Sequence, residues 1–116
     1  MPHITVDYSP RIADFLDLRV FARELQPTVL EPSGSVGTCK TLFRQAAEAH
    51  VADGHDDAAA FVHVEVGLLP GRPEAVKARL SEDVLRLLEK HLGTNRSVVC
   101  SVEVRDLTGS YRLRTF

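Results

Sequence analysis

The sequence predicts one α+β domain over residues 1–116, in which two β-α-β repeats form a four-stranded sheet with two helices on one face. The length of 116 residues is that of a single domain. Segments in each half alternate apolar and polar residues with a period of two, which is typical of half-buried strands. Each is followed by apolar residues spaced three and four apart, which is typical of a helix. A strand, a helix and a returning parallel strand form a right-handed unit.

The first half begins with a strand over residues 3–8. Ser9 and Pro10 then end the strand and begin a helix, because Ser is a good N-cap and Pro is tolerated in the first turn. The helix is predicted to continue to about residue 30. Pro27 lies inside it and predicts a kink or an early end. The apolar stripe consists of Phe15, Leu18, Ala22, Leu25 and Val29.

Residues 31–35 are a turn by composition, and residues 36–47 form the second strand candidate. The first part of this candidate is rich in β-formers and its second part favours a helix, so its second part stays open between the two. Residues 50–57 read as a polar loop. Its His and Asp residues suggest a metal site, but their spacing matches neither HExxH nor an EF-hand, so we predict a solvated turn without a metal.

The second half repeats the pattern with a strand over residues 59–68, a turn at 69–71 and a helix that opens at Arg72 and Pro73. Gly93 is the expected end of this helix. A fourth strand covers residues 98–105, and a short tail with Arg112 and Arg114 follows. The apolar stripe of the second helix consists of Val76, Leu80, Val84, Leu87, Leu88 and Leu92.

Two helices on one face leave the other face of the sheet uncovered. Apolar residues on both faces predict that this open face is not left in water. An oligomer that packs sheet against sheet would cover it.

Charge and composition exclude several classes of protein. Lys plus Arg total 14 against 16 Asp plus Glu, a net charge of -2, whereas a nucleic-acid binder usually has a basic excess. No apolar run approaches the ~20 residues that span a bilayer, and the start lacks the features of a signal peptide. Cys39 and Cys100 form no Cys-x-x-Cys pair and are predicted to be free buried thiols, although a disulfide stays open. We therefore expect a cytoplasmic protein with no nucleic-acid or membrane partner.

Pro2 is the first candidate for chemistry. Initiator Met is usually removed before a small residue, which would leave a prolyl secondary amine at the start of the chain. Ordinary α-amino groups have a pKa of about 7.7–8.0, and burial or a nearby cation lowers it. Such an amine could act as a general base at pH 7. The alternatives are that Pro2 merely precedes a strand, or that a retained Met1 makes its nitrogen an amide.

Arg72 is the second candidate. It stands at the start of a helix, where N–H groups and the helix dipole favour anions, and a guanidinium binds a carboxylate in a bidentate fork. The alternative is a surface Arg at a turn. His3, His63 and His91 are predicted to be surface residues, and no Ser-His-Asp signature or phosphate-binding glycine loop is present.

Several segments together resemble the 5-carboxymethyl-2-hydroxymuconate isomerase family. The first is Met-Pro-His-Ile-Thr-Val-Asp-Tyr-Ser at the start of the chain, and the resemblance continues loosely over nearly all of it. The other segments are Phe21-Ala22-Arg23, Pro27-Thr28, Ala52-Asp53-Gly54-His55-Asp56, Ala60-Phe61-Val62-His63-Val64, Pro70-Gly71-Arg72 and Ser101-Val102-Glu103.

This family belongs to the tautomerase superfamily, with 4-oxalocrotonate tautomerase and macrophage migration inhibitory factor. The resemblance implies a homotrimer of tautomerase-like β-α-β-repeat subunits and no cofactor. It implies that Pro2 is the general base of a keto–enol isomerisation and that Arg72 holds a substrate carboxylate. It also implies a setting in the bacterial breakdown of aromatic acids.

The family's second substrate-binding Arg falls at Cys39 in this chain, and the nearest cation is Lys40. Lys40 could replace that Arg if a bulge re-aimed it, because a shift of one residue along a strand changes the face. Arg44 is another candidate. The C-terminal segment is also shorter than is usual in the family.

We therefore predict a cytoplasmic, cofactor-free tautomerase that acts on a small carboxylate-bearing 2-hydroxydienoate. Pro2 would be its base, and Arg72 with Lys40 would bind the substrate. One alternative is a non-catalytic oligomeric module that binds a small ligand on the same fold. Another is a ferredoxin-like dimer with the same element order but antiparallel strand pairs.

Overall fold

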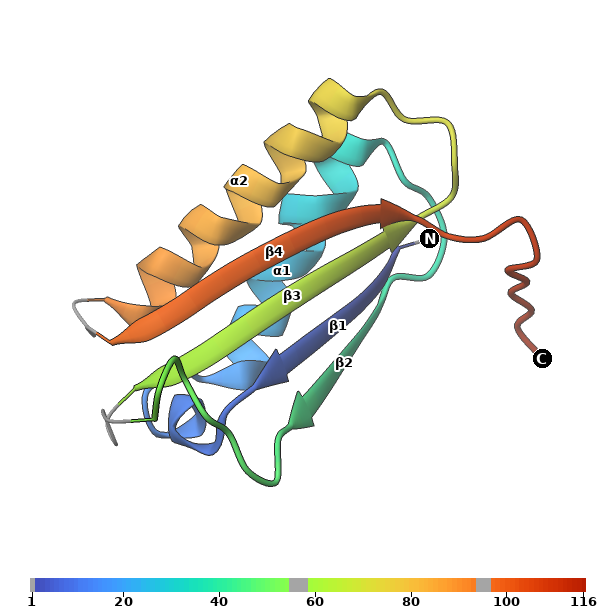
Figure 1. Cartoon of the computed structure of the whole chain (residues 1–116). Coiled ribbons are helices and arrows are strands. Elements are labelled where there is room, and N and C mark those ends of the chain that lie inside the picture. The colour runs from blue at the N-terminus through green and yellow to red at the C-terminus, as the bar shows by residue number, and fades with distance from the viewer. Residues whose placement is uncertain (1, 55–58, 94–96) are drawn as a thin grey trace.

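A four-stranded sheet carries both helices on one face (Figure 1). The computed structural model of the chain describes residues 2–54, 59–93 and 97–116. The α+β fold of two β-α-β repeats is therefore confirmed. In chain order the elements are β1 (His3–Tyr8), the 3-10 helix η1 (Pro10–Asp14), α1 (Leu18–Ser33), β2 (Lys40–Gln45), β3 (Ala60–Leu68), α2 (Glu74–Leu92) and β4 (Val98–Asp106).

The strands lie in the order β2-β1-β3-β4. β1 pairs with β2 in parallel, and β3 pairs with β4 in parallel. The two units join through the antiparallel pair of β1 and β3, in which His3 lies opposite Gly67. The alternative of a ferredoxin-like arrangement is wrong, because it requires antiparallel pairing where these units are parallel.

The core lies between the sheet and the helices, as the alternation predicts. Ile4 and Val6 of β1 are fully buried, and Tyr8 is 6% exposed. Val62, Val64 and Val66 of β3 are also fully buried. α2 buries the predicted stripe, and the four residues at its centre are Leu80, Val84, Leu88 and Leu92.

The first helical segment differs from the prediction of one helix from Ser9 to about residue 30. A 3-10 turn comes first, and α1 begins only at Leu18, where the Asp17 side chain accepts hydrogen bonds from the N–H groups of Arg19 and Val20. Phe21 is fully buried, whereas the neighbouring Ala22 of the predicted stripe is half-buried. Leu25 and Val29 of that stripe are fully buried, as predicted.

The predicted early end at Pro27 is also wrong, since α1 continues to Ser33. A proline inside a helix keeps a helical φ, but it removes one N–H donor and crowds the carbonyl four residues before it, at a cost of about 3 kcal/mol. Thr28 Oγ1 donates to the carbonyl of Glu24 at 2.8 Å, which adds a hydrogen bond beside the proline. Val29 is fully buried two residues later, so the core holds this turn in place.

The second strand is shorter than the candidate over residues 36–47, because β2 covers only Lys40–Gln45. Residues 46–49 are neither strand nor helix, which settles the open choice for that segment. The remaining strands and α2 lie within two residues of their predicted bounds. None of the described helices has both the length and the apolar character that a membrane crossing requires.

The open face of the sheet is more polar than the sequence pattern suggested. Strand register and alternation place polar or charged side chains on most of its positions. The apolar exceptions are Phe61, which is half-buried, and Leu42 and Val99, which are 48% and 55% exposed. The residues of this open face are His3, Thr5, Asp7, Lys40, Leu42, Arg44, Phe61, His63, Glu65, Gly67, Val99, Ser101, Glu103 and Arg105.

Candidate active site

Pro2 is buried directly before β1, at the end of the sheet where β3 and β4 finish (Figure 1). Its carbonyl accepts a hydrogen bond from the backbone N–H of Lys40 at 3.2 Å. The parallel pairing of β1 and β2 thus places the start of β2 beside Pro2. Met1 lies outside the described residues. The Pro2 nitrogen is an amide while Met1 is attached and a secondary amine once Met1 is removed.

Lys40 lies on the open face in register with His3. The ladder from this pair to the end of β2 is continuous, so no bulge re-aims the side chain. Lys40 Nζ donates to the hydroxyl of Tyr111 at 3.1 Å and lies 5.5 Å from the centre of that ring, so it meets the ring at its hydroxyl end. Within residues 2–54, 59–93 and 97–116 no carboxylate pairs with Lys40.

Arg72 reaches the carboxyl end of α1 rather than the start of its own helix. Its Nε donates to the carbonyl of Ser33 at 3.0 Å, its Nη1 to the carbonyl of Leu69 at 3.0 Å, and its Nη2 to the hydroxyl of Ser35 at 3.2 Å. The carboxyl end of a helix is the negative end of its dipole, which favours a cation there. A guanidinium has five N–H groups, so Nη1 and Nη2 each keep an N–H for a further acceptor.

Arg44 lies away from this end of the sheet. It is opposite Asp7, four residues along β2 from Lys40. Its Nε and Nη2 bind the two carboxylate oxygens of Asp7 at 2.8 and 3.0 Å, and this hydrogen-bonded pair raises the pKa of the Arg44 guanidinium. Its charge is therefore already compensated inside the chain.

Two further residues occupy the end of the sheet beside Pro2. The Nδ1 atom of His3 is shielded from solvent and has no hydrogen-bond partner in the described part of the chain. Cys39 is half-buried, and burial raises the pKa of its thiol above the ordinary value. Cys39 and Cys100 are both free, as predicted, but both are half-buried rather than buried.

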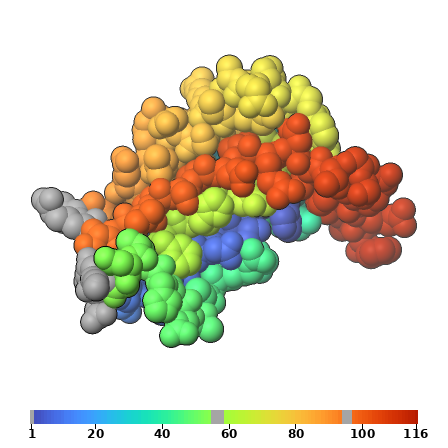
Figure 2. All heavy atoms as spheres, in the orientation of Figure 1, coloured from blue at the N-terminus to red at the C-terminus, as the bar shows by residue number. Residues whose placement is uncertain are grey.

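The sequence did not predict that the C-terminal tail lies at the Pro2 end of the sheet. The backbone N–H of Leu107 donates to the carbonyl of Leu68 at 2.7 Å, and Tyr111 meets Lys40 four residues later. In Figure 2 the tail, in red, lies against the end of the sheet where β1 begins. The tail offered no local signal beyond Tyr111 and three scattered apolar residues, Leu107, Leu113 and Phe116.

Among the described residues, a group that could hold a metal lies elsewhere, on the open face. Side-chain donor atoms of His63, Glu65 and Glu103 lie within 4.8 Å of one another. His63 Nδ1 already shares a hydrogen bond with Ser101 at 2.7 Å, and Glu65 lies 3.4 Å from Arg105. Of the loop over residues 50–57, for which a solvated turn was predicted, residues 50–54 are described and 55–57 lie outside the described residues.

A pocket of about 270 Å³ lies at the other end of the sheet, between α2 and the start of β4. Its lining contains none of the candidate residues, so the chemistry that they offer is not located there. The lining residues are Leu85, Glu89, Leu92, Gly93, Val98 and Cys100.

Comparisons with known proteins agree on family and fold. A family model described as 5-carboxymethyl-2-hydroxymuconate isomerase matches residues 2–115. No curated protein sequence matches the chain.

Solved structures share the fold at low identity. A 5-carboxymethyl-2-hydroxymuconate isomerase from Deinococcus radiodurans R1 is similar, with a TM-score of 0.86, 21% identity and coverage of 98% of this chain and 90% of that chain. A 5-carboxymethyl-2-hydroxymuconate delta-isomerase gives a TM-score of 0.84 at 22% identity over 100% of this chain and 89% of that one. A fused 4-OT symmetric trimer gives 0.70 at 16% identity over 95% and 91%. These likenesses confirm the tautomerase-like fold.

Proposed function

The chain belongs to the 5-carboxymethyl-2-hydroxymuconate isomerase family, a family of isomerases, and from that premise we propose that it is a cofactor-free tautomerase with Pro2 as its general base. The substrate class is a small 2-hydroxydienoate that carries carboxylate groups, and the setting is the breakdown of aromatic acids. The observation that carries this proposal is the position of Pro2, which is buried at the end of a central strand beside Lys40, a cation with no carboxylate partner among the described residues.

The proposed reaction is a proton transfer with no change in composition. After removal of Met1, the Pro2 nitrogen is a secondary amine, and burial disfavours its protonated form. The nitrogen takes the proton from the 2-hydroxyl oxygen of the dienol, and the protonated Pro2 then returns a proton to a carbon of the diene to give the keto isomer. The base is a backbone atom, so it lies at the strand end between the two faces of the sheet.

Two cations flank this strand end. Lys40 lies on the open face, and Arg72 lies on the helix side beside the end of α1. We assign each of them to a carboxylate of the substrate, where they would also stabilise negative charge that develops on the dienolate. Arg44 is less suited to this role because Asp7 already occupies its guanidinium.

The assay that tests this proposal follows the conversion of enol to keto form in the ultraviolet, with mono-, di- and tricarboxylate enols. Pro2→Ala should lower kcat/KM by about 10²–10⁴-fold, the range that a general base supplies. Mass spectrometry of untagged protein should show that Met1 is absent from the active material. Full turnover by the Pro2→Ala variant would exclude Pro2 as the base.

The hydrogen bonds that Arg72 makes within the chain favour a second candidate function, a non-catalytic module that binds a small ligand. Its three hydrogen bonds to Ser33, Leu69 and Ser35 are those of a residue that stabilises a loop. This candidate predicts a retained Met1 and carboxylate binding without turnover, so the same mass measurement separates the two functions.

We also propose that the protein is a cytoplasmic homotrimer. Two similar structures are described as symmetric trimers, and Leu42 and Val99 leave apolar area on the open face for a neighbouring subunit. The free thiols of Cys39 and Cys100 fit a reducing compartment. A solution mass three times the 12.8 kDa of the chain would support the trimer, and a monomer would contradict it.

A further inference from the structure

The C-terminal tail crosses the open face at the end of the sheet where Pro2 lies. The Leu107 side chain lies over Gly67, where an added Cβ would be 2.6 Å from Leu107 Cδ2. Gly67 is opposite His3, the residue that follows Pro2. Tyr111 then reaches Lys40 on β2, beyond β1. The tail thus contacts β3 through Leu107 and β2 through Tyr111.

The hydrogen bond between Lys40 and Tyr111 determines which of their N–H and O–H donors remain for a further hydrogen bond. A lysine ammonium has three donors and no acceptor, so the phenolic oxygen is the acceptor of this 3.1 Å hydrogen bond. The O–H of Tyr111 must then point to a different acceptor. No acceptor for it lies within the described ranges 2–54, 59–93 and 97–116, and the same holds for two N–H groups of Lys40. Both side chains are partly buried.

We infer that Tyr111 is a substrate-binding residue, which together with Lys40 holds one carboxylate of the substrate at the Pro2 end of the sheet. The donor atoms Nζ and Oη are 3.1 Å apart, so they can each bind one oxygen of the same carboxylate. The inference rests on the proposed function for the identity of the substrate. It adds that the pair of Lys40 and Tyr111 performs the bidentate binding that a single lysine does not provide.

The test compares Tyr111→Phe with Tyr8→Phe, which removes the same hydroxyl at the opposite end of β1. KM and kcat are measured for a dicarboxylate enol, and thermal unfolding shows that both variants are folded. Titration calorimetry with adipate, an unreactive dicarboxylate, measures binding without turnover. Its neutral diamide is the control ligand.

We expect Tyr111→Phe to raise KM and the Kd for adipate about ten-fold, as for a lost hydrogen bond to a charged group, with a smaller change in kcat. Tyr8→Phe should match the wild type. The inference also predicts that Tyr111→Phe has less effect in a Lys40→Gln background, because the two side chains bind the same group.

Equal KM and Kd values for Tyr111→Phe and Tyr8→Phe would overturn the inference while the proposed function stands. If the wild type turns over no enol but binds adipate in a way that depends on Tyr111, the carboxylate site stands and the proposed function fails. If the wild type neither turns over enols nor binds adipate, both fail.

Discussion

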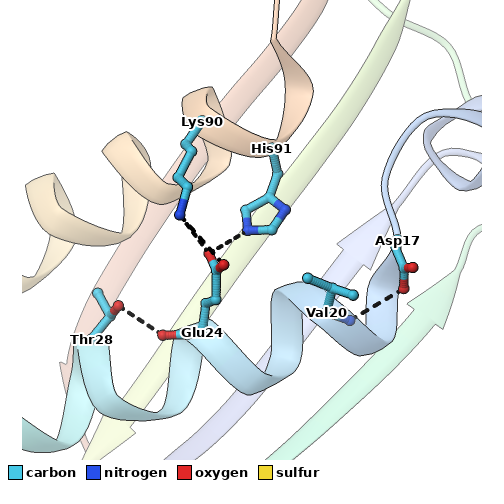
Figure 3. A network of polar contacts seen from close by, with 6 residues as sticks. All are labelled: Asp17, Val20, Glu24, Thr28, Lys90 and His91. Carbon is cyan, nitrogen blue, oxygen red and sulfur yellow. Dashed lines mark hydrogen bonds and ion pairs between the residues drawn. The ribbon is translucent and has the colours of Figure 1, made fainter.

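Glu24 of α1 accepts a hydrogen bond from Nε2 of His91 in α2, with 2.7 Å between nitrogen and oxygen (Figure 3). Lys90 Nζ approaches the same carboxylate at 3.2 Å. The His91 ring also meets Phe21 edge-on, with the ring centres 5.5 Å apart. These contacts connect the two helices above the buried core, so one carboxylate fixes how α1 and α2 lie against each other.

Because of the contact between Glu24 and His91, we expect the stability of the protein to fall in acid. The hydrogen bonds from His91 and Lys90 lower the pKa of Glu24 below its ordinary value in the folded state. The carboxylate therefore contributes stability that is fully present above the unfolded-state pKa and is lost as the pH falls through the lower folded-state pKa. We expect Glu24→Gln to lower the Tm at pH 7 and to have little effect near pH 3.

Thermal unfolding across this pH range checks the prediction. Glu82→Gln, at an exposed position of α2, is the control and should follow the wild type throughout. A Tm difference between Glu24→Gln and the wild type that does not change with pH would contradict it.

Arg72 predicts a loss of stability as well as a loss of substrate binding. Arg72→Ala removes the donor for the carbonyls of Ser33 and Leu69, which should cost about 1–3 kcal/mol in urea unfolding. Arg72→Lys keeps the charge but cannot reach three acceptors, so it should recover only part of that stability. Arg79→Ala is the control, because Arg79 is exposed and its nearest carboxylate, on Asp83, is 3.8 Å away. An Arg72→Ala variant as stable as this control would show that the three contacts contribute nothing.

A side chain added at Gly67 should clash with Leu107 of the C-terminal tail. In Gly67→Ala the new Cβ would lie 2.6 Å from Leu107 Cδ2, so Leu107 must move, at a cost of about 1 kcal/mol in the free energy of unfolding. Gly109→Ala is the matched control and should change it by less than about 0.5 kcal/mol, because nothing lies within 4 Å of its added Cβ. Adding Leu107→Ala to Gly67→Ala should cost less than the two single changes together. Strict additivity would mean that the two side chains do not meet.

Lys40 and Arg44 predict opposite results in the same assay. Lys40→Gln should raise the KM for a dicarboxylate enol at least about ten-fold, because it removes a cation beside Pro2. Arg44→Gln should leave KM within about two-fold, since four residues of strand place it about 13 Å from Lys40 and Asp7 holds its guanidinium. Equal increases in KM for both variants would show that the substrate extends along β2.

Local periodicity predicted most of the fold. β1, β3 and α2 each bury one face continuously, so their apolar residues recur at the period of the element. α1 was predicted less well, because the Asp17 cap after the 3-10 turn sets a later start and because the buried Val29 keeps the helix intact beyond Pro27. Both effects depend on contacts that a periodic pattern does not contain.

For the candidate site residues, the sequence predicted their positions in the elements but not the contacts between them. The sequence by itself put Pro2 before a strand, Lys40 inside the strand candidate over residues 36–47 and Arg72 at the opening of the second helix. Only the tertiary structure brought Lys40 beside Pro2, turned Arg72 toward Ser33 and placed Tyr111 on Lys40. The physical reason is that these contacts join residues 38, 39 and 71 positions apart, through strand register and the path of the tail. Spacing along the chain determines which face a side chain takes, but the pairing of distant backbones determines which side chains meet.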